Sequence, residues 1–277
     1  MNKPSAIFMG SKPGAAVALD VAVRRGWRIP YVVVTRDEYQ PWTAGPTLRD
    51  IAQRHRLPVV VQKELPRSQK VDFVISYMYR NLVKADVLAL ARRAAVNFHC
   101  APLPDYGGYG CYNRAILENA REFGATCHYM DESFDTGALL KVRRFPIAAA
   151  RETALSLERR AQEEMIRLFH DFCALAESGA SLPREAQDRS RQRYMTEADL
   201  ARLKQIPPDA DAEMIDRYAR AFWFPPYEGA YLLLDGRRIE VMPGQVKTEL
   251  AALVHRSDFD RLARVAENHD RREDAAA

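Results

Sequence analysis

Short apolar runs alternate with helix-like patterns along the first part of the chain. The apolar runs predict buried strands over residues 5–9, 31–35, 59–61, 71–76 and 95–99. Helices are predicted between these strands, one ending at Arg25 and the others over residues 47–56 and 84–93. Strands that alternate with helices form a parallel sheet with right-handed crossovers. The pattern therefore predicts an α/β fold with a doubly wound, mostly parallel sheet.

The middle of the chain extends the sheet and adds one long helix. We predict a helix over residues 111–119 and strands over residues 125–130 and 138–145. From residue 153 to residue 178, apolar side chains recur at helical spacing, and Gly179 closes the pattern. A helix of this length should cover one face of the sheet.

A polar, charged stretch broken by a proline precedes a smaller C-terminal part. Beyond it the pattern predicts two short helices, a hairpin and a final amphipathic helix, over residues 194–203, 212–221, 231–242 and 250–266. The aromatic segment 222–230 should bury against the main domain or, in a homodimer, against a second subunit. We expect three units, namely a main domain over 1–180, a linker over 181–192 and a small α+β module over 193–277.

Composition narrows the class of protein without identifying a function. The 277 residues are 47% hydrophobic, which is enough for a packed core, and the formal net charge is only +4. Basic residues are scattered or lie in short clusters, which we interpret as solvent-exposed faces of helices and loops. A nucleic-acid partner is therefore not favoured. The four cysteines lack metal-ligand spacing and predict reduced thiols in a cytoplasmic protein without a metal. No apolar run approaches the ~20 residues of a membrane span.

Polar residues with catalytic potential stand at the end of the fifth predicted strand. Asn97 and His99 share one face of that strand, and Asp135 follows in a Ser-Phe-Asp-Thr-Gly turn between two later strands. Each one alone has a structural reading, as a turn former, a hydrogen-bonded histidine or a loop cap. Together they supply an amide donor, an imidazole base and an orienting carboxylate, which are the roles that addition to a carbonyl requires.

Two motifs carry a resemblance to a known family. Asn-x-His followed by Pro-Leu-Pro (residues 97–104), and Gly-Ala-Thr-x-x-x-Met-Asp-Glu-x-x-Asp-Thr-Gly (residues 124–137), resemble the signature of formyltetrahydrofolate-dependent formyltransferases. The resemblance covers about the first two thirds of the chain and implies a Rossmann-like formyltransferase domain. It also implies 10-formyltetrahydrofolate as co-substrate and Asn97, His99 and Asp135 as catalytic residues.

The resemblance also implies where the two reactants bind. The pterin ring would lie against the segment after the fourth strand and the loop that carries Asp135, through Met78, Tyr79, Arg80, Leu82, Asp131 and Thr136. The loop after the first strand is a candidate phosphate site, and an aromatic loop could frame a sugar or base, so the candidate substrate residues are Gly10, Ser11, Lys12, Tyr106, Tyr109 and Tyr112. The chain departs from the family at Ala101, at Gly107-Gly108 and at Ser133. We interpret His128 as a structural or supporting residue.

The preferred function is N-formylation of a nucleotide-linked amino sugar, as in the biosynthesis of surface polysaccharides such as lipopolysaccharide O-antigen. Methionyl-tRNA formyltransferase is the second hypothesis, since a tRNA enzyme usually has a longer, more basic tail. Formylation of another small amine, such as hydroxyornithine, is the third. The fourth is an inactive module that binds folate or a nucleotide sugar, and the fifth is a formyltetrahydrofolate hydrolase. The sequence does not identify the nucleotide, or decide whether His99 acts as a base or as an imidazolium.

Overall fold

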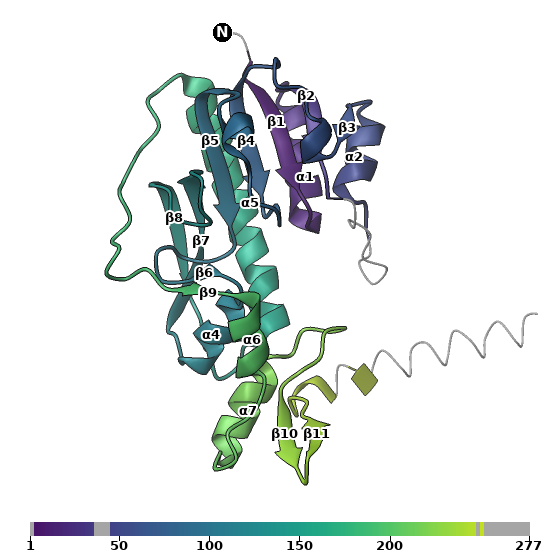
Figure 1. Ribbon diagram of the computed structural model, residues 1–277, viewed down its shortest axis with the longest axis vertical. Helices are drawn as coiled ribbons and strands as arrows, with labels where there is room; N and C mark the ends of the chain where they lie inside the picture. The colour runs from purple at the N-terminus through teal and green to yellow at the C-terminus, as the bar shows by residue number, and fades with distance from the viewer. Residues whose placement is uncertain (1–2, 36–44, 248–249, 252–277) are drawn as a thin grey trace, which may run out of the picture.

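A seven-stranded sheet forms the centre of the computed structural model, which describes residues 3–35, 45–247 and 250–251 (Figure 1). Its order is β3-β2-β1-β4-β5-β7-β8. The first five strands are parallel, whereas β7 is antiparallel to both β5 and β8. The bounds are β1 (Ser5–Gly10), β2 (Arg28–Val33), β3 (Val59–Val60), β4 (Val71–Tyr77), β5 (Ala91–His99), β7 (Glu122–Tyr129) and β8 (Leu139–Pro146). The predicted α/β class with a mostly parallel sheet is confirmed.

Helices cover both faces of the sheet. One face packs against α1 (Pro13–Arg24), α2 (Leu48–Arg54) and the long α5 (Ala154–Ser178), and the other against the short α3 (Ala85–Leu88). The apolar stripe of α5 is buried as predicted, and its Phe169 and Phe172 pack edge-on against aromatic rings of β1, β4 and β5. A capping box starts α5 and left-handed Gly179 ends it.

The C-terminal elements pack against α4 (Cys111–Leu117) at one end of the molecule (Figure 1). They comprise α6 (Glu197–Leu203), α7 (Ala212–Ala221) and the antiparallel hairpin of β10 (Tyr231–Leu234) and β11 (Arg237–Glu240). Apolar side chains from these elements and from α4 and α5 form a core separate from that of the sheet. The division into domain, linker and module remains a prediction.

Two sequence predictions of helices were wrong in part. Residues 84–93 form only the short α3, because Ala91 and Ala94 pair with Val71 and Phe73 and so begin β5. Residues 194–203 start with the short strand β9 (Tyr194–Met195), which pairs with β6 (Gly107–Gly108), and α6 begins only after the Thr196 cap. Long-range pairing overrides local helix propensity in both places. Most of the final helix predicted over 250–266 lies outside the described residues.

Candidate active site

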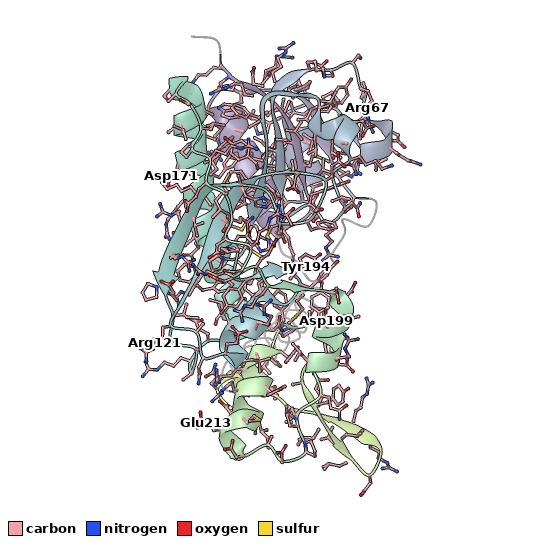
Figure 2. All side chains as sticks on the ribbon, turned by 60° about the vertical axis from the view of Figure 1, so that its left-hand side comes forward. Arg67, Arg121, Asp171, Tyr194, Asp199 and Glu213 are labelled. Carbon is pink, nitrogen blue, oxygen red and sulfur yellow. The ribbon has the colours of Figure 1, made fainter. Side chains whose placement is uncertain are left out.

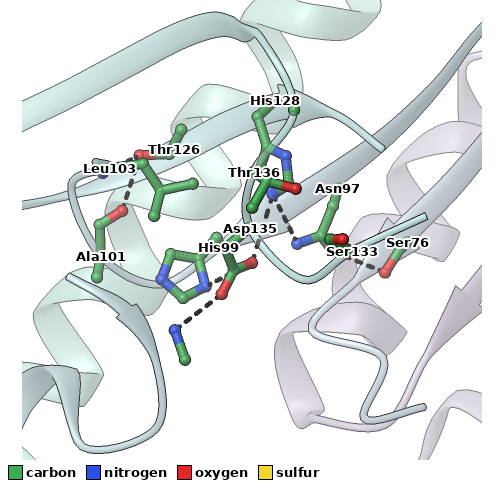
Figure 3. Close-up of polar contacts among 12 residues, drawn as sticks. Ser76, Asn97, His99, Ala101, Leu103, Thr126, His128, Ser133, Asp135 and Thr136 are labelled. Carbon is green, nitrogen blue, oxygen red and sulfur yellow. Dashed lines mark hydrogen bonds and ion pairs between the residues drawn. The ribbon is translucent and has the colours of Figure 1, made fainter. Parts of the chain in front are cut away.

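A row of three polar side chains crosses β4, β5 and β7 (Figure 3). Asn97 is in register with Ser76 on one side and with His128 on the other. Ser76 Oγ donates a hydrogen bond to Asn97 Oδ1 at 2.7 Å, and Asn97 Nδ2 lies 3.0 Å from His128 Nε2. Because Ser76 occupies the amide oxygen, the amide nitrogen faces His128 and donates to Nε2. An amide nitrogen carries two hydrogens, so Asn97 has a second one for an oxygen of a bound molecule.

His99 lies two residues further along β5 and is 8% exposed. Its Nε2 lies 2.8 Å from the carbonyl oxygen of Tyr106. A carbonyl can only accept, so Nε2 carries a proton and Nδ1 is the basic nitrogen of the neutral ring. Nδ1 faces Asp135 Oδ1 at a distance of 3.6 Å. The backbone therefore sets the tautomer of His99, and the carboxylate faces the nitrogen that can gain a proton.

Asp135 is held in the loop between β7 and β8 by contacts to several elements. Its backbone has a φ of 58°, in the left-handed region that a non-glycine residue rarely adopts. Asp135 Oδ2 accepts a hydrogen bond from the Gly108 N–H at 2.9 Å. Asp135 Oδ1 lies 3.6 Å from His99 Nδ1 and 3.6 Å from His128 Nε2. The carboxylate thus joins the Asn97 row to the His99 ring.

The surroundings of Asp135 keep its carboxyl group ionised. Burial by itself disfavours the carboxylate, but the charge of His99, the contacts with His128 and the Gly108 N–H outweigh it and hold the pKa of Asp135 well below its usual range. A carboxylate with this environment suits the stabilisation of an imidazolium.

The predicted pterin-binding residues lie at the same edge of the sheet. Tyr79 and Arg80 line a cavity of about 500 Å³ after β4, together with Val34, Thr35, Val61, Gln62, Lys63, Arg67, Asn81 and Lys84. Met78 and Leu82 belong to the same segment. Asp131 and Thr136 bond to each other, since Thr136 Oγ1 donates to Asp131 Oδ1 at 2.7 Å, and so they shape the loop that holds Asp135.

The predicted substrate residues fall into two groups. Gly10 ends β1, where a Cβ would lie 2.5 Å from Ala15 Cβ. Next to it, Ser11 Oγ donates to the Met78 carbonyl at 2.9 Å, and Lys12 Nζ lies 3.2 Å from Glu158 Oε1. These residues connect the candidate substrate loop to the candidate pterin segment.

The aromatic loop is less open than its sequence suggests. The Tyr106 ring is buried between the guanidinium groups of Arg114 and Arg193. Tyr112 packs against Phe123, and its buried hydroxyl has no hydrogen-bond partner within the described part of the chain. Tyr109 differs from both, because it is 46% exposed. The contribution of Tyr106 that the structure shows is its carbonyl oxygen, which holds His99.

Sequence reasoning underrated His128 and missed the backbone groups. His128 contacts both Asn97 and Asp135, yet its place beside Asn97 depends on strand register, which the chain does not display. The Tyr106 carbonyl and the Gly108 N–H are available in any sequence and leave no signal in it. Among the described residues, no group of three or more His, Cys, Asp or Glu side chains could hold a metal ion.

Residues 27–171 match the family model described as formyl transferase, which is just over half of the chain. The chain belongs to the formyl transferase family. The resemblance inferred from the two sequence motifs is therefore confirmed.

Two kinds of formyl transferase are among the similar sequences. GDP-perosamine N-formyltransferase of Brucella melitensis is 35% identical over 167 residues, which cover 60% of this chain and 62% of that protein. The chain thus matches less than two thirds of that relative's length. Methionyl-tRNA formyltransferase of Geobacter sulfurreducens is 27% identical over 248 residues, covering 85% of this chain and 76% of that protein.

Solved structures of two N-formyltransferases share the fold. An N-formyltransferase from Helicobacter canadensis, in complex with folinic acid and dTDP-3-aminofucose, superposes with a TM-score of 0.71 at 20% identity and covers 86% of each chain. A 4-N formyltransferase from Francisella tularensis gives a TM-score of 0.71 at 16% identity over 86% of this chain and 96% of that one. At these identities the likeness establishes the architecture. No helix in the described part of the chain has the length and apolar character needed to cross a membrane.

Proposed function

We propose that this protein is an N-formyltransferase that moves the formyl group of 10-formyltetrahydrofolate to the primary amine of a nucleotide-linked amino sugar. The observation that carries the proposal is the convergence of Asn97, His99 and Asp135, from β5 and the loop after β7, at one edge of the sheet. The donor, base and carboxylate needed for addition to a carbonyl carbon stand within contact of one another or of His128.

The attacking amine must lose a proton as its nitrogen bonds to the formyl carbon. We assign that proton to His99 Nδ1, because the Tyr106 carbonyl already occupies Nε2–H. The imidazolium that forms then faces Asp135 Oδ1, whose negative charge stabilises it. This assignment makes His99 first a base and then a cation, so the two roles left open by the sequence become successive states.

The carbonyl oxygen gains negative charge when the carbon becomes tetrahedral. The second amide hydrogen of Asn97 would bind this oxyanion, an effect typically worth ~3–4 kcal/mol for one preorganised donor. Collapse of the intermediate breaks the bond between the formyl carbon and the folate nitrogen, and the imidazolium returns the proton to that nitrogen. Protons and electron pairs balance across the two steps, and the protein is restored.

The cavity beside Tyr79 and Arg80 supports a folate at this edge. Its lining combines an aromatic residue with the basic residues Arg67, Lys63, Lys84 and Arg80. Cations of this kind suit the carboxylates of the glutamate tail of a folate, while the pterin ring would lie between the segment that carries Met78 and Tyr79 and the loop that carries Asp135. The relative from Helicobacter canadensis was solved with folinic acid, which supports a formyl-folate as the co-substrate.

The choice of a sugar nucleotide over tRNA rests on charge and on the relatives. Two arginines from the basic clusters are paired within the chain, Arg143 with Glu164 and Asp171, and Arg193 with Glu118, so their charges are not free to bind nucleic-acid phosphates. The sugar N-formyltransferase of Brucella melitensis has the higher identity, 35% against 27%. Methionyl-tRNA formyltransferase is the second candidate, because its similarity extends over 85% of this chain.

One assay separates these functions. The protein is incubated with 10-formyltetrahydrofolate and, in parallel, with GDP-, dTDP- and UDP-linked amino sugars, methionyl-tRNA, hydroxyornithine or buffer alone, and the formylated product and free formate are measured. Transfer to a sugar nucleotide is expected. Transfer to tRNA alone would establish the second candidate, and formate release in buffer would indicate a hydrolase. His99→Asn and Asp135→Asn should lose turnover while still binding folate.

A further inference from the structure

The segment that follows α5 contacts both loops of the candidate active site. Here we call residues 185–195 the strap. At one end of the strap, Glu185 and Leu139 exchange backbone hydrogen bonds of 2.7 and 2.9 Å. At the other end, β9 lies beside β6 (Figure 1), and Gly107 N donates to the Arg193 carbonyl at 3.0 Å. The strap therefore contacts both the loop that carries Asp135 and the loop that carries Gly108.

Gln187, near the Glu185 end of the strap, binds the backbone of the Asp135 turn. Its Nε2 donates to the carbonyl oxygen of Asp135 at 2.8 Å and to that of Gly137 at 2.7 Å. Both hydrogens of one amide group are used on the two carbonyls that flank Thr136. Asp135 has the left-handed φ of 58°, so these bonds hold a backbone conformation that is unfavourable for the residue alone.

The oxygen of the same amide group indicates that Gln187 serves to position the Asp135 turn rather than to stabilise the fold. Gln187 Oε1 is buried and has no hydrogen-bond partner among the described residues. A buried polar atom without a partner is unfavourable, and an apolar side chain of similar length would avoid it. Inverting the amide would place its oxygen against two carbonyl oxygens, so the two donated bonds fix its orientation.

The other end of the strap holds the loop that carries Tyr106 and Gly108. Arg193 pairs with Glu118 through bonds of 2.8 and 3.0 Å and covers the Tyr106 ring. Figure 2 shows Tyr194 at the junction between the sheet and the C-terminal helices, and its ring lies against Gly108, where a Cβ would be 3.0 Å away. The strap thus secures both groups that bind the His99–Asp135 pair, the Tyr106 carbonyl and the Gly108 N–H.

We propose that Gln187 is a positioning residue, which places the Asp135 carboxylate against His99 by fixing the turn backbone. The role in formyl transfer rests on the proposed function, whereas the placement of the carboxylate does not. The strap would then be part of the active centre, although it lies beyond residues 27–171 that match the family model. A segment with the polar composition of a linker would contribute directly to the geometry of the reaction.

The test replaces Gln187 by Met, which keeps the length of the side chain and removes both donated bonds. Gln245→Met is the matched control, because the exposed Gln245 donates one bond of 3.2 Å to the Arg151 carbonyl, away from the site. The first readout is independent of activity and follows the Asp135 carboxyl carbon by NMR during an acid titration. The groups that face this carboxyl are His99, His128 and the Gly108 N–H. In Gln187→Met the pKa of Asp135 is expected to rise toward the ordinary range, and in the control it should not move.

The second readout is turnover with the acceptor that the panel identifies. Gln187→Met should lower kcat at least 10-fold with KM values within about 2-fold, because the carboxylate acts on the reacting state more than on binding. In an Asp135→Asn background the same substitution should cost little more, since its effect passes through the carboxylate. The proposal would be overturned if the pKa of Asp135 were the same in Gln187→Met as in the wild type. It would also be overturned if the losses of kcat from Gln187→Met and Asp135→Asn were fully additive in the double variant. A wild-type protein that transfers no formyl group would refute the proposed function, while the titration would still decide the placement by Gln187.

Discussion

Replacing His128 tests whether the row across the strands orients the oxyanion donor. His128 is 2% exposed and accepts the 3.0 Å hydrogen bond from Asn97, so His128→Leu removes the acceptor while filling most of the space. Ser76 still holds the amide oxygen, but the amide plane loses the second of its two anchors. His128→Gln is the matched variant, because its side-chain oxygen can take the place of Nε2.

The size of the effect follows from what Asn97 contributes. A preorganised donor to an oxyanion is worth about 3–4 kcal/mol, and loss of one of its two anchors should remove roughly 1–2 kcal/mol of that stabilisation. At about 1.4 kcal/mol per factor of ten, kcat should fall about 5- to 30-fold in His128→Leu. His128→Gln should stay within about 3-fold of the wild type. Folate affinity should be unchanged in both.

Single-turnover transfer from 10-formyltetrahydrofolate, measured by quenched product analysis, gives the rate of the chemical step. The decisive comparison adds Asn97→Ala, which should itself lower the rate about 100-fold or more. In that background His128→Leu should cost much less, because the donor that it orients is gone and only its contact with Asp135 is still lost. A His128→Leu protein as fast as the wild type, or one whose loss is undiminished without Asn97, would refute the reasoning.

Three more substitutions probe the Asp135 carboxylate, the turn that carries it and the hydrogen bonds of Arg220 to the backbone before α5. Asp135→Asn should destabilise the fold by on the order of 2 kcal/mol at neutral pH. Because folding lowers the pKa of Asp135, the wild type loses this advantage as the pH falls below about 4, and the difference between the two proteins should shrink. Melting curves of both proteins at pH 7 and pH 3.5 would show the change. Gly137→Ala would place a Cβ 1.8 Å from the Tyr129 carbonyl oxygen, so transfer should fall about 100-fold with a lowered melting temperature. Gly244→Ala should be neutral in both assays, because no atom of the described residues lies within 4 Å of the added Cβ. Arg220→Met should lower the free energy of unfolding by about 2–3 kcal/mol, because the buried guanidinium bonds the backbone before α5, and denaturant titration should show this loss without a change in kcat.

Local pattern was enough to predict the frame of the fold and the three candidate catalytic residues. The strands that end at Tyr77 and His99 contain apolar runs, and the long helix shows its buried stripe directly, because burial of a face imposes a period on the chain. Asn97 and His99 were recognisable because they place polar groups at the end of an apolar run, and Asp135 because it stands in a turn between two later runs.

The tertiary structure decided which groups hold these residues in place. His128 stands beside Asn97 through antiparallel register, and Gln187 reaches Asp135 from 52 positions away along the chain. The strand β9, predicted as helix, forms because Gly107 and Gly108 offer an edge to pair with. Such contacts depend on distances between segments that are remote in the chain, and no local period records them. The sequence determined which side chains can act, and the packing of distant segments determined how they are aimed.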